Sequence, residues 1–367
     1  MKIAILLFGQ PRFFSMTKNQ IRDEFNLPGH DVDFFVHFWN KIGYIPQGDE
    51  HEYDEKELLK EIKEGLPNSV LTPQPKAKNV VINSYDILNE FIEYMVYFGT
   101  KIHKDGYLTP RGTTDRHLPI GKNKQYLRYK FGQHWSMREC FKRIKAYEDQ
   151  NNFQYDIVVK VRTDILYKPK ETYNSEEEYY RAKEEMYANM CLNTPMVKCT
   201  ALRYVDLTEK RKDKTKEGYN QAFYYFYNNH FRIDKQLQTD HNCEEEVGWI
   251  KHTENYNKRL AFNDWTLVAN RKGAEIMFDK WFENYFLTLA KDIKNNKTSS
   301  WFISQSDHCL QGQFLLNYDI AASRISPRRD VRLINPSEIK KDVTIEGKIL
   351  VHNKKQVRED CIKHFRR

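Results

Sequence analysis

Three short stretches of nearly uninterrupted apolar residues constrain the fold of this chain more than any other feature. They are Ile3 to Phe8, Asp33 to Phe38 and Ile157 to Val161. A continuous apolar run of this length is typical of a strand buried on both faces, as in a parallel sheet covered by helices. Segments with helical spacing, such as Gln20 to Phe25 and Glu55 to Gly65, separate the first runs. The sequence therefore predicts an α/β fold with a mostly parallel central sheet flanked by helices.

Several further elements follow from the same patterns. Val80 and Val81 begin a short strand, and Gln133 to Tyr147 form a helix. Trp265 to Ala269 form a strand, after which Asn270 is the N-cap of a helix that continues through Phe278 to Tyr285. Ile349 to Val351 form a last short strand. Residues 170 to 260 contain charged and tyrosine-rich segments without a repeat, and we interpret them as a mixed insertion.

The net charge indicates that the partner of the chain is anionic, but it does not identify the partner. Lys and Arg number 59 and Asp and Glu 51, which gives a formal net charge of +8. This excess favours an anionic partner, and nucleotide diphosphates, acidic glycans, nucleic acids and anionic lipids all qualify. Lysines, arginines and tyrosines interleave in residues 100 to 130. We interpret this segment as a mobile binding loop or as a solvated surface excursion.

The sequence predicts a cytoplasmic protein with no transmembrane segment. The first apolar run ends at Gly9, Gln10, Pro11 and Arg12, so it suits a buried strand better than a signal peptide. Nowhere do about 18 apolar residues run together, as a transmembrane helix requires. The six cysteines are scattered and include no C-x-x-C pair, which predicts reduced thiols. Phosphate-loop, G-x-G-x-x-G and H-E-x-x-H motifs are also missing, which counts against kinases, dinucleotide oxidoreductases and zinc proteases.

Two acidic motifs differ in where they stand relative to their strands. Ligands of parallel α/β sheets collect beyond the carboxyl ends of the strands. Asp31 and Asp33 form a D-x-D motif, but it precedes its strand and is expected at the wrong edge. Arg162 and Asp164 follow theirs. This pair suits a sugar diphosphate, with Asp164 holding Mg²⁺ or Mn²⁺ and Arg162 neutralising the departing phosphates; the alternative is a structural ion pair that caps the sheet.

The order of these motifs resembles a group of GT-A-like glycosyltransferases, many of them encoded by viruses or bacteriophages. In that group a first strand precedes a G-Q-P-R loop, a D-x-F-x-H-x-W-like strand follows, and R-x-D comes after the central strand. Here these motifs are Gly9 to Arg12, Asp33 to Trp39 and Arg162 to Asp164. Asn263-Asp264 and an acid near a helix start, Asp307, are further matches. The resemblance covers the first 170 residues and residues 260 to 320.

The resemblance implies roles for residues in the loop after the first strand and for residues on the second strand. Gly9, Gln10 and Arg12 would lie beside the nucleotide, where glycine permits close backbone approach and arginine contacts phosphate; the alternative is a tight turn with a surface arginine. His37 and Trp39 alternate on one face of the second strand, so they line the donor pocket or fill the core, and core filling is favoured for Trp39.

Metal and acid-base roles rest on the same resemblance. Arg162 stands where metal-dependent GT-A enzymes commonly carry the first acid of D-x-D, so dependence on Mn²⁺ or Mg²⁺ stays open. His352, after the last short strand, resembles a late histidine that completes the metal shell, although a lone histidine is more often structural. Two acids, Asp307 and Asp264, qualify as the base that activates an acceptor hydroxyl. For Asp307 the alternative is an ordinary helix cap.

The sequence thus predicts a GT-A, single-Rossmann-like glycosyltransferase that uses a nucleotide sugar, with a UDP-sugar favoured. Residues 1–170 would bind the nucleotide sugar and residues 171–367 the acceptor, with an acceptor-side insertion at about 170–260, all packed as one continuous domain. The expected acceptor is a hydroxyl of a glycan or glycolipid. The alternatives are a hydroxymethylated base in phage DNA, and a catalytically silent nucleic-acid or carbohydrate-binding protein on the same scaffold. A virus-encoded member would act in the host cytoplasm.

Overall fold

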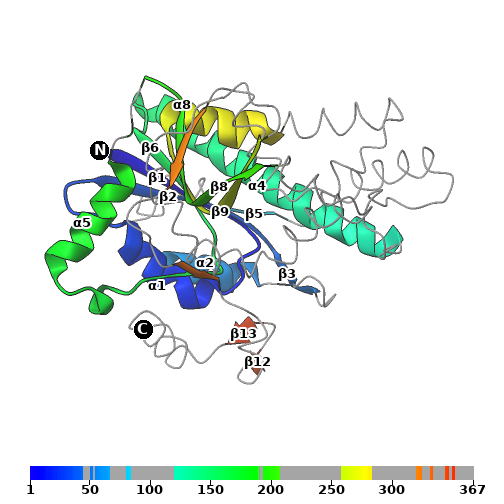
Figure 1. Cartoon of the computed structure of the whole chain (residues 1–367). Helices are drawn as coiled ribbons and strands as arrows, with labels where there is room; N and C mark the ends of the chain where they lie inside the picture. The colour runs from blue at the N-terminus through cyan, green and yellow to red at the C-terminus, as the bar shows by residue number, and fades with distance from the viewer. Residues whose placement is uncertain are drawn as a thin grey trace.

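A seven-stranded sheet forms the centre of the molecule (Figure 1). The computed structural model describes residues 1–43, 50–52, 54–66, 80–83, 120–188, 190, 193–206, 258–282, 320–324, 331–333, 344–346 and 349–351. The strands, in their order across the sheet, are β10 (Ala321–Arg324), β8 (Met196–Asp206), β9 (Lys258–Asn270), β6 (Ile157–Val161), β1 (Lys2–Gly9), β2 (Asp31–Trp39) and β5 (Val80–Asn83). Strands from both predicted halves of the chain therefore share one sheet.

The strands of this sheet are mostly parallel. β1 pairs in parallel with β2 and β6, β2 with β5, and β10 with β8, whereas β9 is antiparallel to both β6 and β8. All strands of the sheet except β9 therefore share one direction. This confirms the predicted fold class, an α/β fold with a mostly parallel sheet flanked by helices, which is the arrangement that the resemblance to GT-A transferases implies.

Helices cover both faces of the sheet (Figure 1). On one face lie α1 (Phe14–Phe25) and α2 (Glu55–Gly65); on the other lie α4 (Ile120–Asn151), α8 (Arg271–Ala274) and the π-helix η6 (Glu275–Lys280). Ile3, Ile5 and Leu7 of β1 point to the first face and join a fully buried cluster with side chains of α1 and α2. Burial on both faces explains why the first strand is apolar throughout.

The strand order creates a switch point between β1 and β6. After β1 the chain continues outward to β2 and β5, and it then crosses back through α4 to place β6 on the other side of β1. At such a point the connections leave the carboxyl ends of two adjacent strands in opposite directions, which opens a crevice between them. The residues after Gly9 and after Val161 therefore occupy the place in the sheet where ligands of α/β proteins usually bind.

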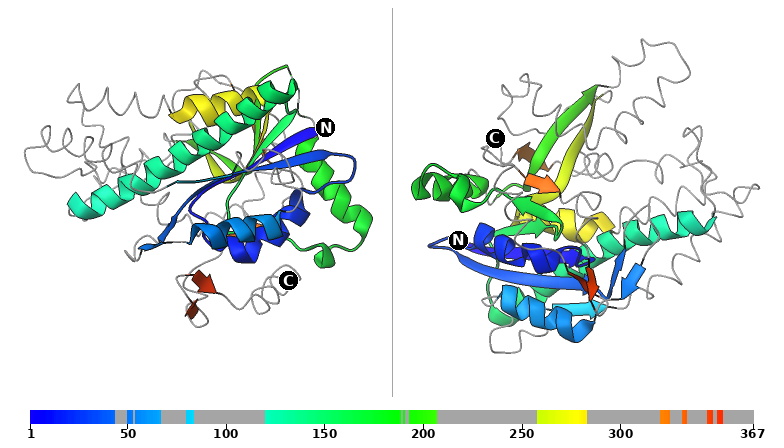
Figure 2. Two further views of the ribbon diagram at one scale, coloured as in Figure 1. Left: turned by 180° about the vertical axis from the view of Figure 1, so that it is seen from behind. Right: turned by 90° about the horizontal axis from the view of Figure 1, so that it is seen from below.

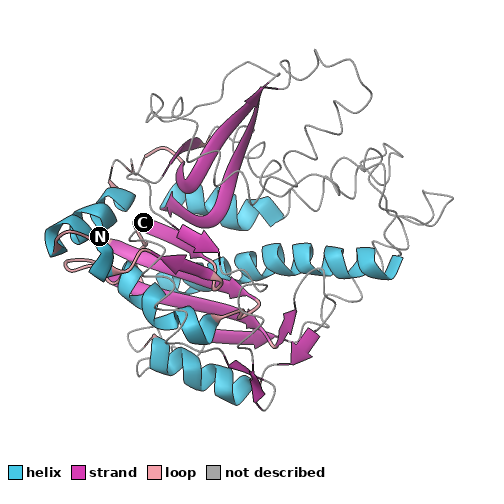
Figure 3. Ribbon diagram, turned by 60° about the horizontal axis from the view of Figure 1, so that its bottom comes forward, coloured by secondary structure: helices cyan, strands magenta, loops and turns pink. Residues whose placement is uncertain are grey.

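Helix α4 differs from the prediction at its N-terminal end. The sequence predicts a loop over residues 120 to 130, and this prediction is wrong, because these residues form the first turns of a helix that continues to Asn151. Figure 3 shows this end of α4 running past the sheet. A helix segment that leaves the sheet needs no apolar face, so its polar sequence does not argue against a helix. The rest of the predicted loop, residues 100 to 119, lies outside the described residues.

The region predicted as an insertion contains both regular elements and part of the central sheet. A short 3-10 turn, η3 (Lys170–Thr172), precedes helix α5 (Glu176–Tyr187), which begins at an N-cap formed by Ser175. β8 follows, and with β9 it forms a long pair of strands that projects from the sheet (Figure 3). Residues 207 to 257 lie outside the described part of the chain.

Three two-stranded sheets complete the described structure. They are β3 (Lys41–Gly43) with β4 (Glu50–Glu52), β7 (Ile165–Tyr167) with β11 (Val331–Leu333), and β12 (Thr344–Glu346) with β13 (Ile349–Val351). The predicted last strand therefore exists as β13, but it pairs with β12 away from the central sheet, as Figure 2 shows. In the described part of the chain, no helix is long and apolar enough to cross a membrane.

Candidate active site

The structure brings together the two loops that the sequence singled out at the ends of β1 and β6. The hydroxyl of Thr163 donates a hydrogen bond to the carbonyl oxygen of Gln10 at 3.2 Å. The hydroxyl of Thr17, in the first turns of α1, donates to the carbonyl oxygen of Thr163 at 2.7 Å. These bonds join the loop after β1, the helix that follows it and the turn after β6 at the switch point.

The loop after β1 has an unusual backbone at both ends. Gly9 has φ of +93°, a value that side-chain-bearing residues rarely adopt, although a Cβ atom there would meet nothing within 4 Å. Phe13, the N-cap of α1, has φ of +53° and makes no side-chain cap bond. Between them the Nε of Arg12 donates to Oε1 of Gln10 at 2.8 Å. Glycine adopts such a φ readily, whereas the left-handed backbone of Phe13 is strained, and strain of this kind persists where the surrounding structure holds it.

Arg162 and Asp164 face each other, as their spacing predicts. Nε and Nη2 of Arg162 donate to Oδ1 and Oδ2 of Asp164, each at 2.8 Å. The side chain of Arg162 is 28% exposed and that of Asp164 is 10% exposed. The geometry is the bidentate fork in which arginine binds carboxylates most strongly.

Two guanidinium groups determine the charge of Asp164. Burial acts to raise the pKa of its carboxyl group, but the charge and hydrogen bonds of Arg162, and then the charge of Arg12, hold that pKa below the ordinary value. The effect of Arg12 shows that the first loop is close enough to act on the second electrostatically. Asp164 is therefore ionised at neutral pH, between two cations.

A divalent metal does not fit Asp164 as the structure presents it. A metal ion needs carboxylate oxygens with lone pairs directed at it, and both oxygens of Asp164 accept from Arg162. Among the described residues, no three His, Cys, Asp or Glu side chains cluster as a metal site would require. His352, the second predicted ligand, lies outside the described residues.

His37 lies in the core beneath the first loop. Its ring is fully buried and makes edge-to-face contacts with Trp39 and Trp135. Its Nδ1 is 2.6 Å from the hydroxyl of Ser136, which donates to the carbonyl oxygen of His37 and accepts from the backbone N–H of Gly9 at 3.0 Å. Core filling describes both His37 and Trp39, so a contact between His37 and the nucleotide stays a prediction.

The hydroxyl of Ser136 holds the ring of His37 in place. Its oxygen lies 2.9 Å from the carbonyl oxygen of His37 and 2.6 Å from Nδ1 of the same residue. Burial, and then the charge of Arg143, lower the pKa of His37 to about 3, so the ring is neutral at physiological pH. Ser136 thus links β1, β2 and α4 at the base of the first loop.

Asp264 lies in an irregular part of β9 next to the end of β6. Thr266 pairs with Val161, the last residue of β6, and Asp264 precedes Thr266 by two residues. Against β8, Leu267 pairs with Cys199 and Asn263 with Ala201, so three residues of β9 stand opposite one residue of β8. Such bulges are frequent beside active sites, where they redirect side chains. The backbone thus places Asp264 at the same edge as Asp164. Asp307 lies outside the described residues.

Sequence reasoning missed the hydroxyl residues that hold the two loops together. Thr163 stands between two predicted residues, so attention to the whole turn would have included it. Thr17 and Ser136 had no comparable signal, because a single hydroxyl residue in a helix is ordinary and its partner lies in another element. The positions of Gly9, Gln10, Arg12, Arg162 and Asp164 were predicted, and their shared location is now described.

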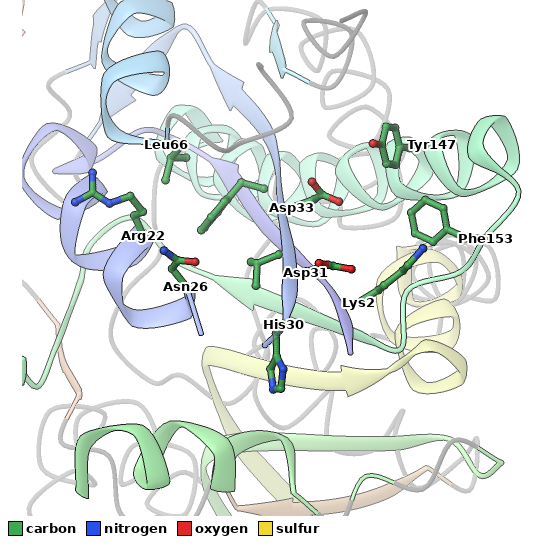
Figure 4. A pocket seen from close by; sticks show the side chains of 11 residues that line it. Lys2, Arg22, Asn26, His30, Asp31, Asp33, Leu66, Tyr147 and Phe153 are labelled. Atoms are coloured by element: carbon green, nitrogen blue, oxygen red, sulfur yellow. The ribbon is translucent and has the colours of Figure 1, made fainter. Parts of the chain in front are cut away.

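The D-x-D motif lies at the opposite edge of the sheet, as predicted. Asp31 is level with Lys2 at the start of β1, and Asp33 accepts a hydrogen bond from the hydroxyl of Tyr155 at 2.5 Å. Figure 4 shows both carboxylates lining a cavity of about 440 Å³ at this edge, with Lys2 and Phe153 nearby. The ammonium group of Lys2 is 3.9 Å from the centre of the Phe153 ring. This cavity is remote from the switch point, because it lies at the amino ends of β1 and β2.

No protein-family model matches the chain, and no curated protein matches it. Among solved structures, the chain is similar to the galactosyltransferase LgtC in complex with donor and acceptor sugar analogues, at 10% sequence identity. The alignment covers 88% of this chain and 73% of that chain, with a TM-score of 0.28. A TM-score this low supports no conclusion about a shared fold or function.

Proposed function

We propose that the protein is a GT-A glycosyltransferase that transfers a sugar from a nucleotide-sugar donor to a hydroxyl group of a glycan or glycolipid. The observation that carries this proposal is the meeting of the Gly9–Arg12 and Arg162–Asp164 loops at the switch point of a mostly parallel sheet. Two of the motifs that resemble GT-A transferases, the G-Q-P-R loop and R-x-D, are thus neighbours in space as well as ordered in sequence.

The first loop suits the diphosphate of the donor. It connects a buried strand to the N-terminus of α1, and backbone N–H groups at such a terminus attract anions. The first turn of α1 contains no acidic residue that would oppose an anion. Gly9 lets the backbone approach a ligand closely, and Arg12 adds a positive charge within the same loop.

The transfer step needs a base on the acceptor side. An acceptor hydroxyl forms a bond to the anomeric carbon while the bond from that carbon to the diphosphate breaks, and the hydroxyl proton must pass to a base. We assign this role to Asp264 or Asp307. The position of Asp264 beside the end of β6 supports the first candidate. The negative charge that develops on the departing nucleotide would be stabilised by Arg12 and Arg162.

Turnover with a panel of nucleotide sugars tests the proposal. The protein is incubated with UDP-, GDP- and CMP-linked sugars, with and without Mn²⁺, and released nucleotide is measured. We expect release from one donor class, with UDP-sugars favoured. Absence of both release and donor binding would sink the proposal and leave the silent binding protein as the better account.

Paired variants test the base. We expect Asp264→Asn or Asp307→Asn to lower kcat by about 100-fold or more, because the amide cannot accept the proton. Asp31→Asn is the matched control, since it makes the same change in an exposed acid at the opposite edge of the sheet. If all three variants release nucleotide at the wild-type rate, the base lies elsewhere.

A further inference from the structure

The turn after β6, from Arg162 to Asp164, pairs its carboxylate with an arginine, whereas a metal site leaves carboxylate oxygens available to the ion. Asp164 is the only acid of the turn that separates β6 from β7, and both of its oxygens accept hydrogen bonds from Arg162. A divalent cation would have to displace a bidentate guanidinium group from a carboxylate that is 10% exposed. Breaking such a pair leaves both charges without their partner in a partly desolvated place, which costs free energy.

The same turn is held against a second arginine-bearing loop. Thr163, between the paired residues, donates to the carbonyl oxygen of Gln10, and the side chain of Gln10 accepts from Nε of Arg12. A short chain of hydrogen bonds thus connects Arg12 to the turn that contains Arg162. The loop from Gly9 to Phe13 and the turn from Arg162 to Asp164 together contain two arginines and one carboxylate.

We propose that Arg12 and Arg162 supply the positive charge that holds the donor diphosphate, and that Asp164 positions Arg162 instead of ligating a divalent metal. This inference rests on the proposed function for its ligand and deepens it, because it assigns how the pyrophosphate group is held. It also reverses the expected role of Asp164 as a metal ligand.

The geometry of arginine explains how Asp164 performs this role. A guanidinium group is planar and carries five N–H donors, of which the fork to Asp164 uses one on Nε and one on Nη2. The fork fixes the plane and the direction of the group, so Arg162 loses little rotamer freedom when a phosphate binds its exposed side. Arginine binds phosphate oxygens in the same bidentate manner as carboxylates.

Calorimetric titration with inorganic pyrophosphate tests the inference independently of the nucleotide and the sugar. We expect the wild-type protein to bind pyrophosphate in the presence of EDTA, and to bind the Mn²⁺–pyrophosphate complex no more tightly. Arg162→Gln and Arg12→Gln should each weaken binding in EDTA about tenfold or more, the loss expected for a charged hydrogen-bonding group.

Two further variants separate a loss of charge from a loss of fold. Arg22→Gln is the matched control, because Arg22 also pairs with an acid, Asp23, and has a side chain 32% exposed, but it lines the cavity at the opposite edge of the sheet. It should bind pyrophosphate as the wild type does. Arg162→Lys keeps the charge without the fork, so it should bind with intermediate affinity. Thermal unfolding of each variant confirms that it is folded.

Three outcomes would overturn the inference. The first is that pyrophosphate binds only as its Mn²⁺ complex and that Asp164→Asn abolishes this binding. The others are that pyrophosphate binds neither in EDTA nor with Mn²⁺, or that Arg162→Gln binds it with wild-type affinity. The donor panel separates this inference from the proposed function. Binding in EDTA without turnover of any nucleotide sugar would keep the arginine site and refute the transferase, whereas turnover that requires Mn²⁺ would keep the transferase and refute the arginine site.

Discussion

Ser136 shows how a single hydroxyl group can determine the position of a binding loop. It accepts a hydrogen bond from the N–H of Gly9, whose backbone is in the left-handed region, and it donates to the strand that carries His37. Both Ser136 and His37 are fully buried. Because both side chains are enclosed in the core below this loop, we regard them as positioning residues for the first loop.

Replacing Ser136 by alanine should destabilise the protein and disturb the loop. The change removes the buried acceptor of the Gly9 N–H and the hydroxyl that contacts Nδ1 of His37, and we expect a loss of about 1–3 kcal/mol in the free energy of unfolding. Urea denaturation measures this loss. Thr172→Val, which removes a hydroxyl that donates to the carbonyl oxygen of Pro169, is the control and should cost less. Equal losses in both variants would contradict a special role for Ser136.

The burial of neutral His37 should make stability depend on pH. Its folded pKa of about 3 lies below the unfolded value near 6.5, so the unfolded chain binds more protons between these values. The stabilisation is therefore present above pH 6.5 and is lost progressively as the pH falls toward 3. Between pH 7 and pH 5, the free energy of unfolding of the His37→Asn variant should fall by about 2 kcal/mol less than that of the wild type. Equal changes in the free energy of unfolding of both proteins between the two pH values would refute this account.

At the scale of single residues, the sequence predicted the location of a side chain in the fold where that residue directly follows a predicted strand. Gly9 to Arg12 and Arg162 to Asp164 follow apolar runs, so their location at the carboxyl edge could be inferred before their contacts were known. The direct pairing of Arg162 with Asp164 was an alternative that sequence alone left open. The spacing of two residues places them on one side, but it does not say whether they bind each other or a ligand.

Among the secondary-structure elements, the junction between β9 and α8 depends on one buried asparagine. Oδ1 of Asn270 accepts from the N–H of Gly273, as the predicted N-cap requires, and also from the N–H of Met196 at the start of β8. Its amide group donates to the carbonyl oxygen of Thr194. Asn270 therefore fixes a helix start and attaches the segment before β8 to it.

Substitution of Asn270 should cost more than substitution of an ordinary cap. We expect Asn270→Ala to lower the free energy of unfolding by about 2–3 kcal/mol, because a helix cap and two further bonds of a buried side chain are lost. Ser175→Ala, at the exposed start of α5, removes a cap alone and should cost about 0.5–1 kcal/mol. Chemical denaturation of the two variants compares them, and similar losses would show that the contacts to β8 add nothing.

Elements were predicted best where burial imposes a clear period on the sequence. β1, β2, α2 and β6 have the predicted type within a few residues because their apolar residues face a common core. The start of α4 was missed because residues 120 to 130 are mostly polar and basic in sequence, although they form the first turns of a helix that runs past the sheet (Figure 3). The pairing of β13 with β12 was also beyond prediction, because register between distant strands depends on tertiary contacts.

For the molecule as a whole, the net charge bears on the alternative that the partner is DNA. A charge of +8 gives weak affinity for any polyanion, so binding to DNA is informative only through its strength and its dependence on salt. The corrected structure of residues 120 to 130, which are helical, removes part of the flexible basic loop on which the DNA alternative relied.

We therefore expect duplex DNA to behave as a nonspecific ligand. Its dissociation constant at physiological salt should be weaker than about 1 µM, the range of nonspecific binding, and hydroxymethylated DNA should not increase the release of nucleotide from the donor. Fluorescence anisotropy over a series of salt concentrations, together with the donor assay, measures both. Tight binding to hydroxymethylated duplex that stimulates release would favour the DNA-modifying alternative instead.

The interleaving of strands from both ends of the chain limits how this protein can be divided. β6 belongs to the first 170 residues, yet its outer neighbour β9 comes from far along the chain. A fragment that stopped after β7 would present the unpaired backbone of β6, a strand that is apolar except for Lys160, and this invites association with other chains. Residues 1–170 and residues 171–367 therefore cannot be exchanged as independent modules, and chimaeras of this chain would have to be built from loops grafted at the carboxyl edge of the sheet.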